Sequence, residues 1–313
     1  MYRHAAFASL VALTILGLCV GCARTPSTRN AAATRPEKAS TAARRKARST
    51  PARTPTPTLS PMAVLSPSAK SATAAAQQAL TAAVAPLVGD DGQVAVAVDD
   101  LSTGSDVAYS GTQEFVTASI VKVDILSTLL YQAQQSGQPL SSQEQALATT
   151  MIENSNDDAA TALYNDAGQA DGIDQANQAF GLTETTVGTA GYWGLTSTTV
   201  DDQIRLLRLV YTQPSVLTTE SQDYISDLMS EVEVDQQWGV PAAAEAGTTF
   251  MVKNGWLPSG TTGLWEINSI GEVVHDGQRM LIAVLSEGNS TEDSGISLVQ
   301  TVAEAAAGAV AKG

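Results

Sequence analysis

A helix that is apolar on almost every side constrains the fold of this chain more than any other segment. Residues 119–135 are predicted to be helical, and their apolar members surround the helix axis: Ile120, Val121, Val123, Ile125, Leu126, Leu129 and Leu130. A helix without a polar face has to be buried, so we expect it in the middle of the fold. The same helix contains Lys122, although lysine is almost never buried without a partner.

The patterns on both sides of this helix predict the rest of the domain. Strands are expected at 93–98, 106–109, 250–256, 264–270 and 280–286. Further helices are expected at 74–85, 142–153, 157–165, 173–180, 199–211, 220–229 and 296–311. The order predicts an α/β (α+β) domain over residues 76–313. An antiparallel sheet of about five strands comes from both chain ends, and an all-helical subdomain lies in the middle.

Charge is divided unevenly along the chain. Residues 1–75 carry 11 Lys and Arg and one acid, whereas residues 76–313 carry 6 basic residues and 31 acids. A domain this acidic is repelled by nucleic acid and by anionic lipid, so we expect no nucleic-acid partner. The basic arm, in contrast, suits a position beside anionic headgroups.

The N-terminus is typical of an export signal. Arg3 and His4 precede an apolar run that ends at Gly21, which is too short to favour a spanning helix, so residues 1–21 are predicted to be a signal peptide. The segment Cys19-Val20-Gly21-Cys22 resembles a bacterial lipobox, except that Cys19 stands where Leu is usual. Lipidation of Cys22 would anchor the chain to the outside of the cell membrane, and ordinary cleavage near Ala23 would instead release it.

Residues 22–75 are predicted to be a disordered tether. Seven of the twelve prolines fall between 23 and 75, without apolar periodicity, and a flexible coil of this length spans roughly 40 Å. Both cysteines, Cys19 and Cys22, lie in the N-terminal export segment, so the domain has no disulfide. The only histidines are His4 and His275, which excludes a His-rich metal site, and no metal or cofactor is expected. His275 is expected in a surface hairpin.

Three short motifs suggest acyl-transfer chemistry. They are Ser119-x-x-Lys122, Ser155-Asn156-Asp157 and Lys253-Asn254-Gly255. Residues three apart on a helix share a face, so a desolvated Lys122 beside another cation can take the proton of Ser119. Lys253 would be that cation, Ser155 would relay a proton, and the N–H groups of Ser119 and Trp256 would hold the oxyanion. Taken singly, the second motif also suits a helix cap and the third a hairpin turn.

Residues 76–311 resemble the serine β-lactamase and penicillin-binding superfamily, nearest the class A β-lactamases. The similar stretches are 115–122 around Ser119, 151–160 around Ser155 and 180–183 before the Ω-loop. The resemblance implies Ser119 as nucleophile, Lys122 as base, Ser155 as proton shuttle and Lys253 as electrostatic partner. It also implies that substrate is bound by Asn156, Asp157, Asn254, Gly255 and Trp256.

Several departures from the family pattern bear on activity. The Ω-loop segment 183–199 has Glu184 as its sole carboxylate, too early to match the deacylating glutamate. The loop is short, which predicts an open pocket beside Tyr192 and Trp193. Asn254 replaces Ser or Thr, Asp157 replaces Asn, and no arginine stands at the usual carboxylate anchor. We therefore expect a poor β-lactamase.

The leading hypothesis is a surface-anchored serine acyl hydrolase or acyltransferase, monomeric and cofactor-free. Its substrates would be β-lactams, peptidoglycan stem peptides or esters, and it would contact the membrane only through its lipid anchor. The alternative is a catalytically weak domain of the same fold that binds cell-wall peptide or a protein partner. Fold alone does not decide between them.

Overall fold

The computed structural model describes residues 67–89 and 93–312, all within the unit of the chain that spans 62–313. The predicted signal peptide (1–21), the predicted lipidation site Cys22 and most of the predicted tether (22–75) lie outside the described residues. Within the described ranges, no helix is both long enough and apolar enough to cross a membrane.

One antiparallel sheet organises the described part of the chain. Its strands are β1 (Gln93–Asp100), β2 (Ser105–Tyr109), β5 (Met251–Pro258), β6 (Trp265–His275) and β7 (Gln278–Asn289). They lie in the order β2-β1-β7-β6-β5, and every neighbouring pair is antiparallel. The predicted sheet of five strands from both chain ends is confirmed. A separate two-stranded ribbon, β3 (Phe115–Val116) with β4 (Ser197–Thr198), was not predicted from the sequence.

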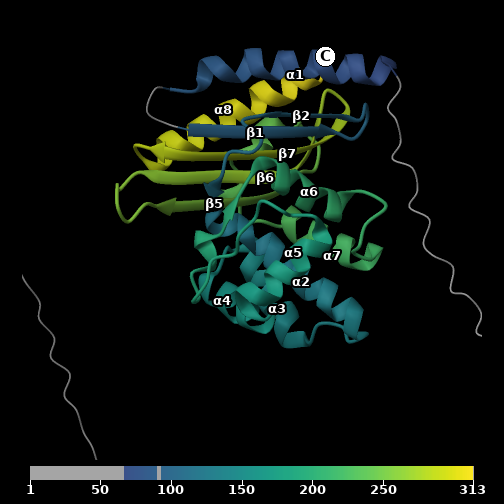
Figure 1. Ribbon diagram of the computed structural model, residues 1–313, viewed down its shortest axis with the longest axis vertical. Helices are drawn as coiled ribbons and strands as arrows, with labels where there is room; N and C mark the ends of the chain where they lie inside the picture. The colour runs from purple at the N-terminus through teal and green to yellow at the C-terminus, as the bar shows by residue number, and fades with distance from the viewer. Residues whose placement is uncertain (1–66, 90–92, 313) are drawn as a thin grey trace, which may run out of the picture. The chain divides into compact units, whose positions relative to one another are not determined.

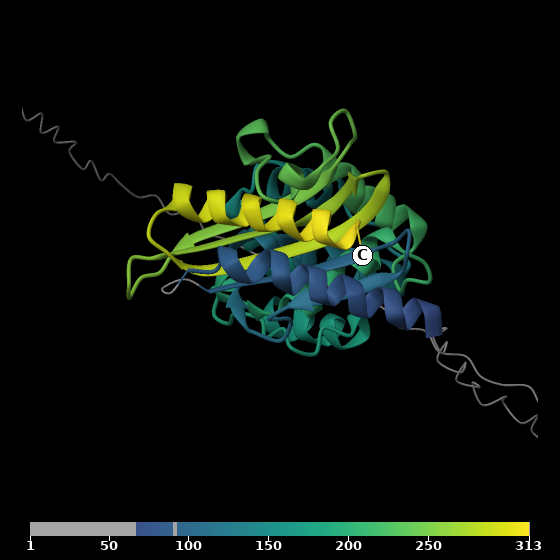
Figure 2. The same ribbon diagram turned by 90° about the horizontal axis from the view of Figure 1, so that it is seen from above.

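Two layers of helices cover the two faces of the sheet. On one face α1 (Pro67–Val84) and α8 (Glu292–Val310) lie side by side over the sheet, as Figures 1 and 2 show. Valines and other apolar side chains of alternate strand positions pack under these two helices. The opposite face carries the second hydrophobic core, which joins the sheet to the helical subdomain. Because successive side chains of a strand point to opposite faces of the sheet, the strands contribute side chains to both hydrophobic cores.

The helical subdomain is drawn below the sheet in Figure 1. Its helices are α2 (Val121–Ser136), α3 (Ser142–Glu153), α4 (Asp157–Asp166), α5 (Gln169–Phe180), α6 (Val200–Tyr211) and α7 (Thr219–Ser230). The described 3₁₀ turns are η1 (Ala85–Leu87), η2 (Ala118–Ile120), η3 (Trp193–Leu195), η4 (Val234–Gln236) and η5 (Val240–Ala243). Helix α2 contacts α3, α4, α5 and α7, and all its residues from Val121 to Leu130 are buried. The predicted central helix is confirmed.

Several element boundaries differ from the sequence prediction, and two of them bear on the tether and on Ser119. Helix α1 begins at Pro67, so the predicted tether boundary at residue 75 falls inside a helix. Alanine and serine continue the pattern upstream of residue 74, and a proline at the first helical position is compatible with a helix start. The helix predicted from Ser119 begins as the 3₁₀ turn η2 and becomes α-helical only at Val121.

Candidate active site

Ser119 lies in the tight turn that joins the β3–β4 ribbon to α2. The N–H of Thr117 donates to the carbonyl of Thr196 at 2.8 Å, which ties this turn to the segment before α6. Ala118 has a φ of +46°, a left-handed conformation that costs energy for any residue with a Cβ. The turn sets Ser119 just before the N-terminal end of α2, where the helix dipole favours a developing negative charge.

Strands β5 and β6 hold the same turn from the other side. A Cβ on Gly255 would lie 2.6 Å from the carbonyl oxygen of Thr117 and 2.7 Å from the nitrogen of Ser119, so only glycine fits there. The buried amide of Asn268 donates to the carbonyls of Val116 at 2.8 Å and Thr117 at 3.0 Å. Sequence reasoning missed Asn268. Its only signal was a polar residue inside a strand that is buried on both faces.

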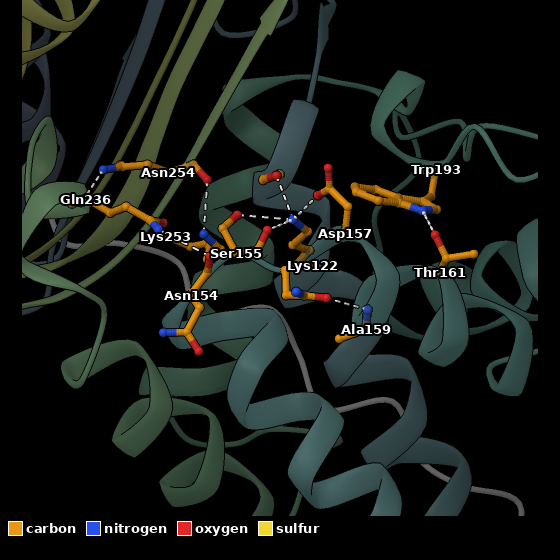
Figure 3. A network of polar contacts seen from close by, with 12 residues as sticks. Lys122, Asn154, Ser155, Asp157, Ala159, Thr161, Trp193, Gln236, Lys253 and Asn254 are labelled. Carbon is orange, nitrogen blue, oxygen red and sulfur yellow. Dashed lines mark hydrogen bonds and ion pairs between the residues drawn. The ribbon is translucent and has the colours of Figure 1, made fainter. Parts of the chain in front are cut away.

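Lys122 is the centre of the polar network in Figure 3. Its ammonium nitrogen lies 2.8 Å from Ser119 Oγ, 3.1 Å from Ser155 Oγ and 2.6 Å from the carbonyl oxygen of Ser155. It also forms an ion pair of 2.7 Å with Asp157 Oδ1, and its side chain is fully buried. Three N–H groups therefore face four acceptors. The predicted proximity of Ser119, Lys122 and Ser155 is present in the structure.

Ser155 is held between the ends of two helices. Helix α3 ends at Glu153, and α4 begins at Asp157 with Asn156 as its N-cap, whose side chain accepts the N–H of Ala159 at 2.8 Å. Ser155 itself has a φ of +54°. This left-handed residue turns both oxygens of Ser155 toward Lys122. Asn156, predicted to bind substrate, uses its side chain as a helix cap.

Burial and charge set the protonation of the two lysines. Burial lowers the pKa of Lys122 below its usual value, and the hydrogen bond and charge of Asp157 oppose that shift. Burial lowers the pKa of Lys253 to about 7; the charge of Lys122 adds to the shift and that of Asp157 opposes it. Lys253 therefore gives up its proton more easily than a lysine in water does.

Strand alternation separates the residues of the third motif. Lys253 and Gly255 face the helical subdomain, where their partners across the strand are Ile270 and Asn268. The Lys253 ammonium donates to the carbonyl of Asn254 at 3.2 Å. The Asn254 side chain turns the other way and donates to the carbonyls of Gln236 at 2.6 Å and Trp238 at 3.0 Å.

Trp256 also directs its side chain away from Ser119. Its ring packs against that of Trp238, edge to face, with centroids 6.0 Å apart. Its backbone points differently. The N–H of Ser259 donates across the hairpin to Leu264, so the N–H of Trp256, three residues earlier, points to the outer edge of the sheet. This edge lies beside the Ser119 turn, which suits the predicted oxyanion role of that N–H.

The loop before α6 brings Trp193 onto Lys122. The centre of the indole ring lies 4.9 Å from the Lys122 ammonium, and its N–H donates to Thr161 Oγ1 at 3.1 Å. Trp193 is buried, and its ring lies over Lys122. Tyr192, its neighbour, is two-thirds exposed at 66%. The open pocket beside Tyr192 and Trp193 stays a prediction.

Glu184 and His275 have partners away from Lys122. The N–H of Glu184 donates to Asp202, and its carboxylate accepts from Thr199 at 3.4 Å. His275 is the last residue of β6 and lies next to the turn that leads to β7, as expected of a hairpin residue. Its ring forms a hydrogen bond of 2.7 Å with the carbonyl oxygen of Ala243. Among the described residues, no three His, Cys, Asp or Glu side chains gather as metal ligands would.

The sequence of this chain matches a known protein family and curated relatives. Residues 75–146 and 138–310 match the model of the beta-lactamase enzyme family. A putative lipoprotein, LppW, from Mycobacterium tuberculosis and Mycobacterium bovis is 27% identical over 170 residues, which are 52% of this chain. The chain spans about half the length of these curated relatives, with 54% of them covered.

Solved structures share the fold. A class A β-lactamase from Bacteroides cellulosilyticus superposes with a TM-score of 0.66 at 16% identity, covering 76% of this chain and 99% of that one. PBP-A superposes with a TM-score of 0.64 at 20% identity, covering 76% and 96%. A point variant of PBP-A was solved as an acyl-enzyme complex with penicillin G. On the family match over most of its described residues, the chain belongs to the beta-lactamase enzyme family of serine hydrolases.

Proposed function

We propose that this protein is a serine acyl hydrolase or acyltransferase that works through an acyl-enzyme at Ser119. The observation that carries the proposal is the contact of 2.8 Å between Ser119 Oγ and the amine of Lys122, a lysine with no exposed surface. A buried amine loses its proton more easily than one in water, so it can act as a base. A surface lysine at the same spacing would stay charged.

The proposed reaction uses the groups around this contact. Neutral Lys122 takes the hydroxyl proton of Ser119 as Oγ attacks the acyl carbon. The N–H groups of Ser119 and Trp256 stabilise the oxyanion that forms. Ser155, whose Oγ is 3.1 Å from the same amine, passes the proton to the leaving group. Lys253 adds positive charge to the site.

We further propose that hydrolysis of the acyl-enzyme is slow. Asp157 is the one carboxylate that contacts Lys122 among the described residues, and it is bound in an ion pair. The Trp193 ring covers another side of the Lys122 ammonium, and we propose that it limits the access of water on that side. General-base assistance contributes about 10²–10⁴-fold to such a step, so its absence predicts a poor β-lactamase.

Candidate substrates are β-lactams, peptidoglycan stem peptides and simple esters. We propose that the domain acts outside the cell, lipidated at Cys22 and held by the tether. The lipobox-like sequence supports this placement, as does the name of the mycobacterial relatives, which are called lipoproteins. Release after cleavage near Ala23 is the alternative. Labelling with a radioactive fatty acid, with Cys22→Ser as control, decides between the two.

The test of the proposed function is the intact mass of the full chain after incubation with a penicillin. We expect an increase equal to one penicillin that persists for minutes or longer. The Ser119→Ala variant should gain no mass and keep a similar melting temperature. An adduct that forms equally on the Ser119→Ala variant would show that the reactive residue lies elsewhere.

One observation favours the second candidate, a catalytically weak domain that binds cell-wall peptide or a protein partner. The Asp157 carboxylate supports the charged form of Lys122, which is the form that cannot act as a base. Under this alternative no acyl donor modifies Ser119. A peptidoglycan fragment would still shift the melting temperature, and would do so equally for the Ser119→Ala variant.

A further inference from the structure

The described part of the chain presents almost no positive charge to solvent near Ser119. Lys122 and Lys253 have no exposed surface. The three arginines of the domain are all in ion pairs with acids: Arg205 with Asp202, Arg208 with Asp99 and Asp106, and Arg279 with Glu272. Lys312 lies in the turn directly after α8, the helix that covers the face of the sheet opposite the helical subdomain. Among the described side chains, a substrate carboxylate near Ser119 would therefore find no exposed cation that is free of an acid partner.

Exposed negative charge, in contrast, adjoins the site. Asp157 keeps 76% of its side chain exposed while its Oδ1 contacts Lys122 at 2.7 Å. Next to Ser155, the amide of Asn154 donates to Glu233 at 2.5 Å, and the N–H of Glu233 donates to the carbonyl of Glu153. Glu231 is close enough to act on Glu153 as well. These acids border the site on the side of Ser155.

Asp157 and Ser119 are close neighbours because they share one partner. Oδ1 of Asp157 and Oγ of Ser119 both contact the amine of Lys122, so they lie within two hydrogen-bond lengths of each other. A cation on a substrate could therefore contact Asp157 while the acyl carbon of the same molecule contacts Ser119. Charged hydrogen bonds of this kind are stronger than neutral ones.

We propose that Asp157 selects acyl donors that carry an ammonium group next to the scissile carbonyl, and that this ammonium activates the site by taking Asp157 from Lys122. The proposal rests on the proposed function and names its substrate class. Amino-acyl esters and peptides with a free amine near the scissile bond belong to this class. Donors with a carboxylate at that position are disfavoured.

Activation follows from the loss of one ion pair. Once the substrate ammonium pairs with Asp157, the Lys122 ammonium is left buried without its counter-charge and releases a proton to water in the cleft. The neutral amine then accepts the proton of Ser119 as the new bond from Oγ to the acyl carbon forms. The bond from the acyl carbon to the leaving alcohol breaks, and the alcohol receives this proton through Ser155. Lys122 ends neutral and Ser119 acylated.

The experiment compares three matched esters on the full chain. The 4-nitrophenyl esters of alanine, N-acetylalanine and N-succinylalanine carry an ammonium on the α-carbon, no charge, and a carboxylate at the far end of the N-acyl group. The first burst of nitrophenol gives the acylation rate, Ser119→Ala supplies the blank, and intact mass confirms the adduct. We expect the ammonium ester to acylate about tenfold faster than the neutral one at pH 7, since exposure of Asp157 limits the gain. The anionic ester should be slowest.

Two variants that each remove one negative charge test whether Asp157 itself causes the preference for the ammonium ester. Asp157→Asn should reduce the preference for the ammonium ester to less than about twofold. It should also speed the neutral ester roughly threefold to tenfold, because Lys122 has lost the partner that favours its charged form. Asp158→Asn, a neighbour in the first turn of α4, removes the same charge and should preserve the preference.

Each contrary result overturns a defined part of the argument. Equal rates for the three esters, or a preference for the anionic one, would refute the selection while leaving the acyl-enzyme proposal intact. If Asp158→Asn removes the preference as fully as Asp157→Asn does, the overall negative charge of the domain selects the substrate, and Asp157 has no special role. No burst with any ester would refute the proposed function and this inference together.

Discussion

Gly255 lies so close to the Ser119 turn that Gly255→Ala directly tests whether strand β5 positions this turn. The new Cβ would lie 2.6 Å from the carbonyl oxygen of Thr117, 2.7 Å from the nitrogen of Ser119 and 2.9 Å from that of Ile120. All three are backbone atoms, so no side chain can turn away to make room. Normal contacts are longer, and the strand and the turn must separate by roughly 0.5–1 Å.

The expected cost is larger for reaction rate than for stability. Overpacking typically costs about 1–3 kcal/mol of unfolding free energy. A displacement of about 1 Å in a catalytic group can reduce rate by about 10²-fold, and here the displaced group is the nucleophile together with an oxyanion N–H. We therefore expect acylation by a fluorescent penicillin to fall about a hundredfold.

The assay is the rate of labelling at saturating penicillin, at a temperature well below the melting temperature of the variant. Gly260→Ala is the matched control, since a Cβ there meets no atom within 4 Å and should alter neither rate nor stability noticeably. If Gly255→Ala labels at the native rate with a native melting temperature, β5 does not constrain the Ser119 turn, and the proposed oxyanion arrangement is wrong.

Three further perturbations test single groups. Lys122→Arg should reduce acylation to the level of Ser119→Ala, because guanidinium stays protonated, and native burst kinetics would exclude Lys122 as the base. Trp193→Ala should remove the cover over Lys122 and shorten the lifetime of the penicillin adduct about tenfold or more, at a stability cost of about 3–5 kcal/mol; an unchanged lifetime in intact-mass time courses would mean that the indole does not exclude the water. Lys253→Met should stabilise the fold more at pH 6 than at pH 10. The folded-state pKa of about 7 lies below the unfolded value, so native stability is reduced below pH 7 and recovers as the pH rises toward 10.5. The difference should be on the order of 3 kcal/mol in urea unfolding, and an equal effect at both pH values would contradict the buried charge.

Local signals in the sequence predicted most elements well. Residues 142–153 form α3 as expected, because Ser141 and Glu144 form a reciprocal capping box that defines its start. Strand β6 runs to His275, whereas the expectation ended it at 270. Gly271 and Glu272 interrupt the local apolar pattern, but pairing with β7 continues through both residues. The length of β6 is therefore set by its pairing with β7 and not by the residue pattern of β6 alone.

The sequence alone determined which chemical groups this domain has available. A serine and a lysine three residues apart on an apolar helix, a second serine and a second lysine could be identified without coordinates, and so could the loss of the Ω-loop glutamate. These signals are local, since they depend on spacing, helix burial and residue type.

Only the tertiary structure decided how these groups are partnered. Asp157 is 35 residues from Lys122, and Trp193, which covers the same ammonium, and Asn268, which holds the Ser119 turn, lie still further along the chain. Alternation along β5 separated Lys253 and Gly255 from the side chains of Asn254 and Trp256. Such contacts form when the sheet closes over the helical subdomain, and no periodicity along the chain encodes which distant residues then meet. The partners of Lys122, more than Lys122 itself, set its charge and its access to water.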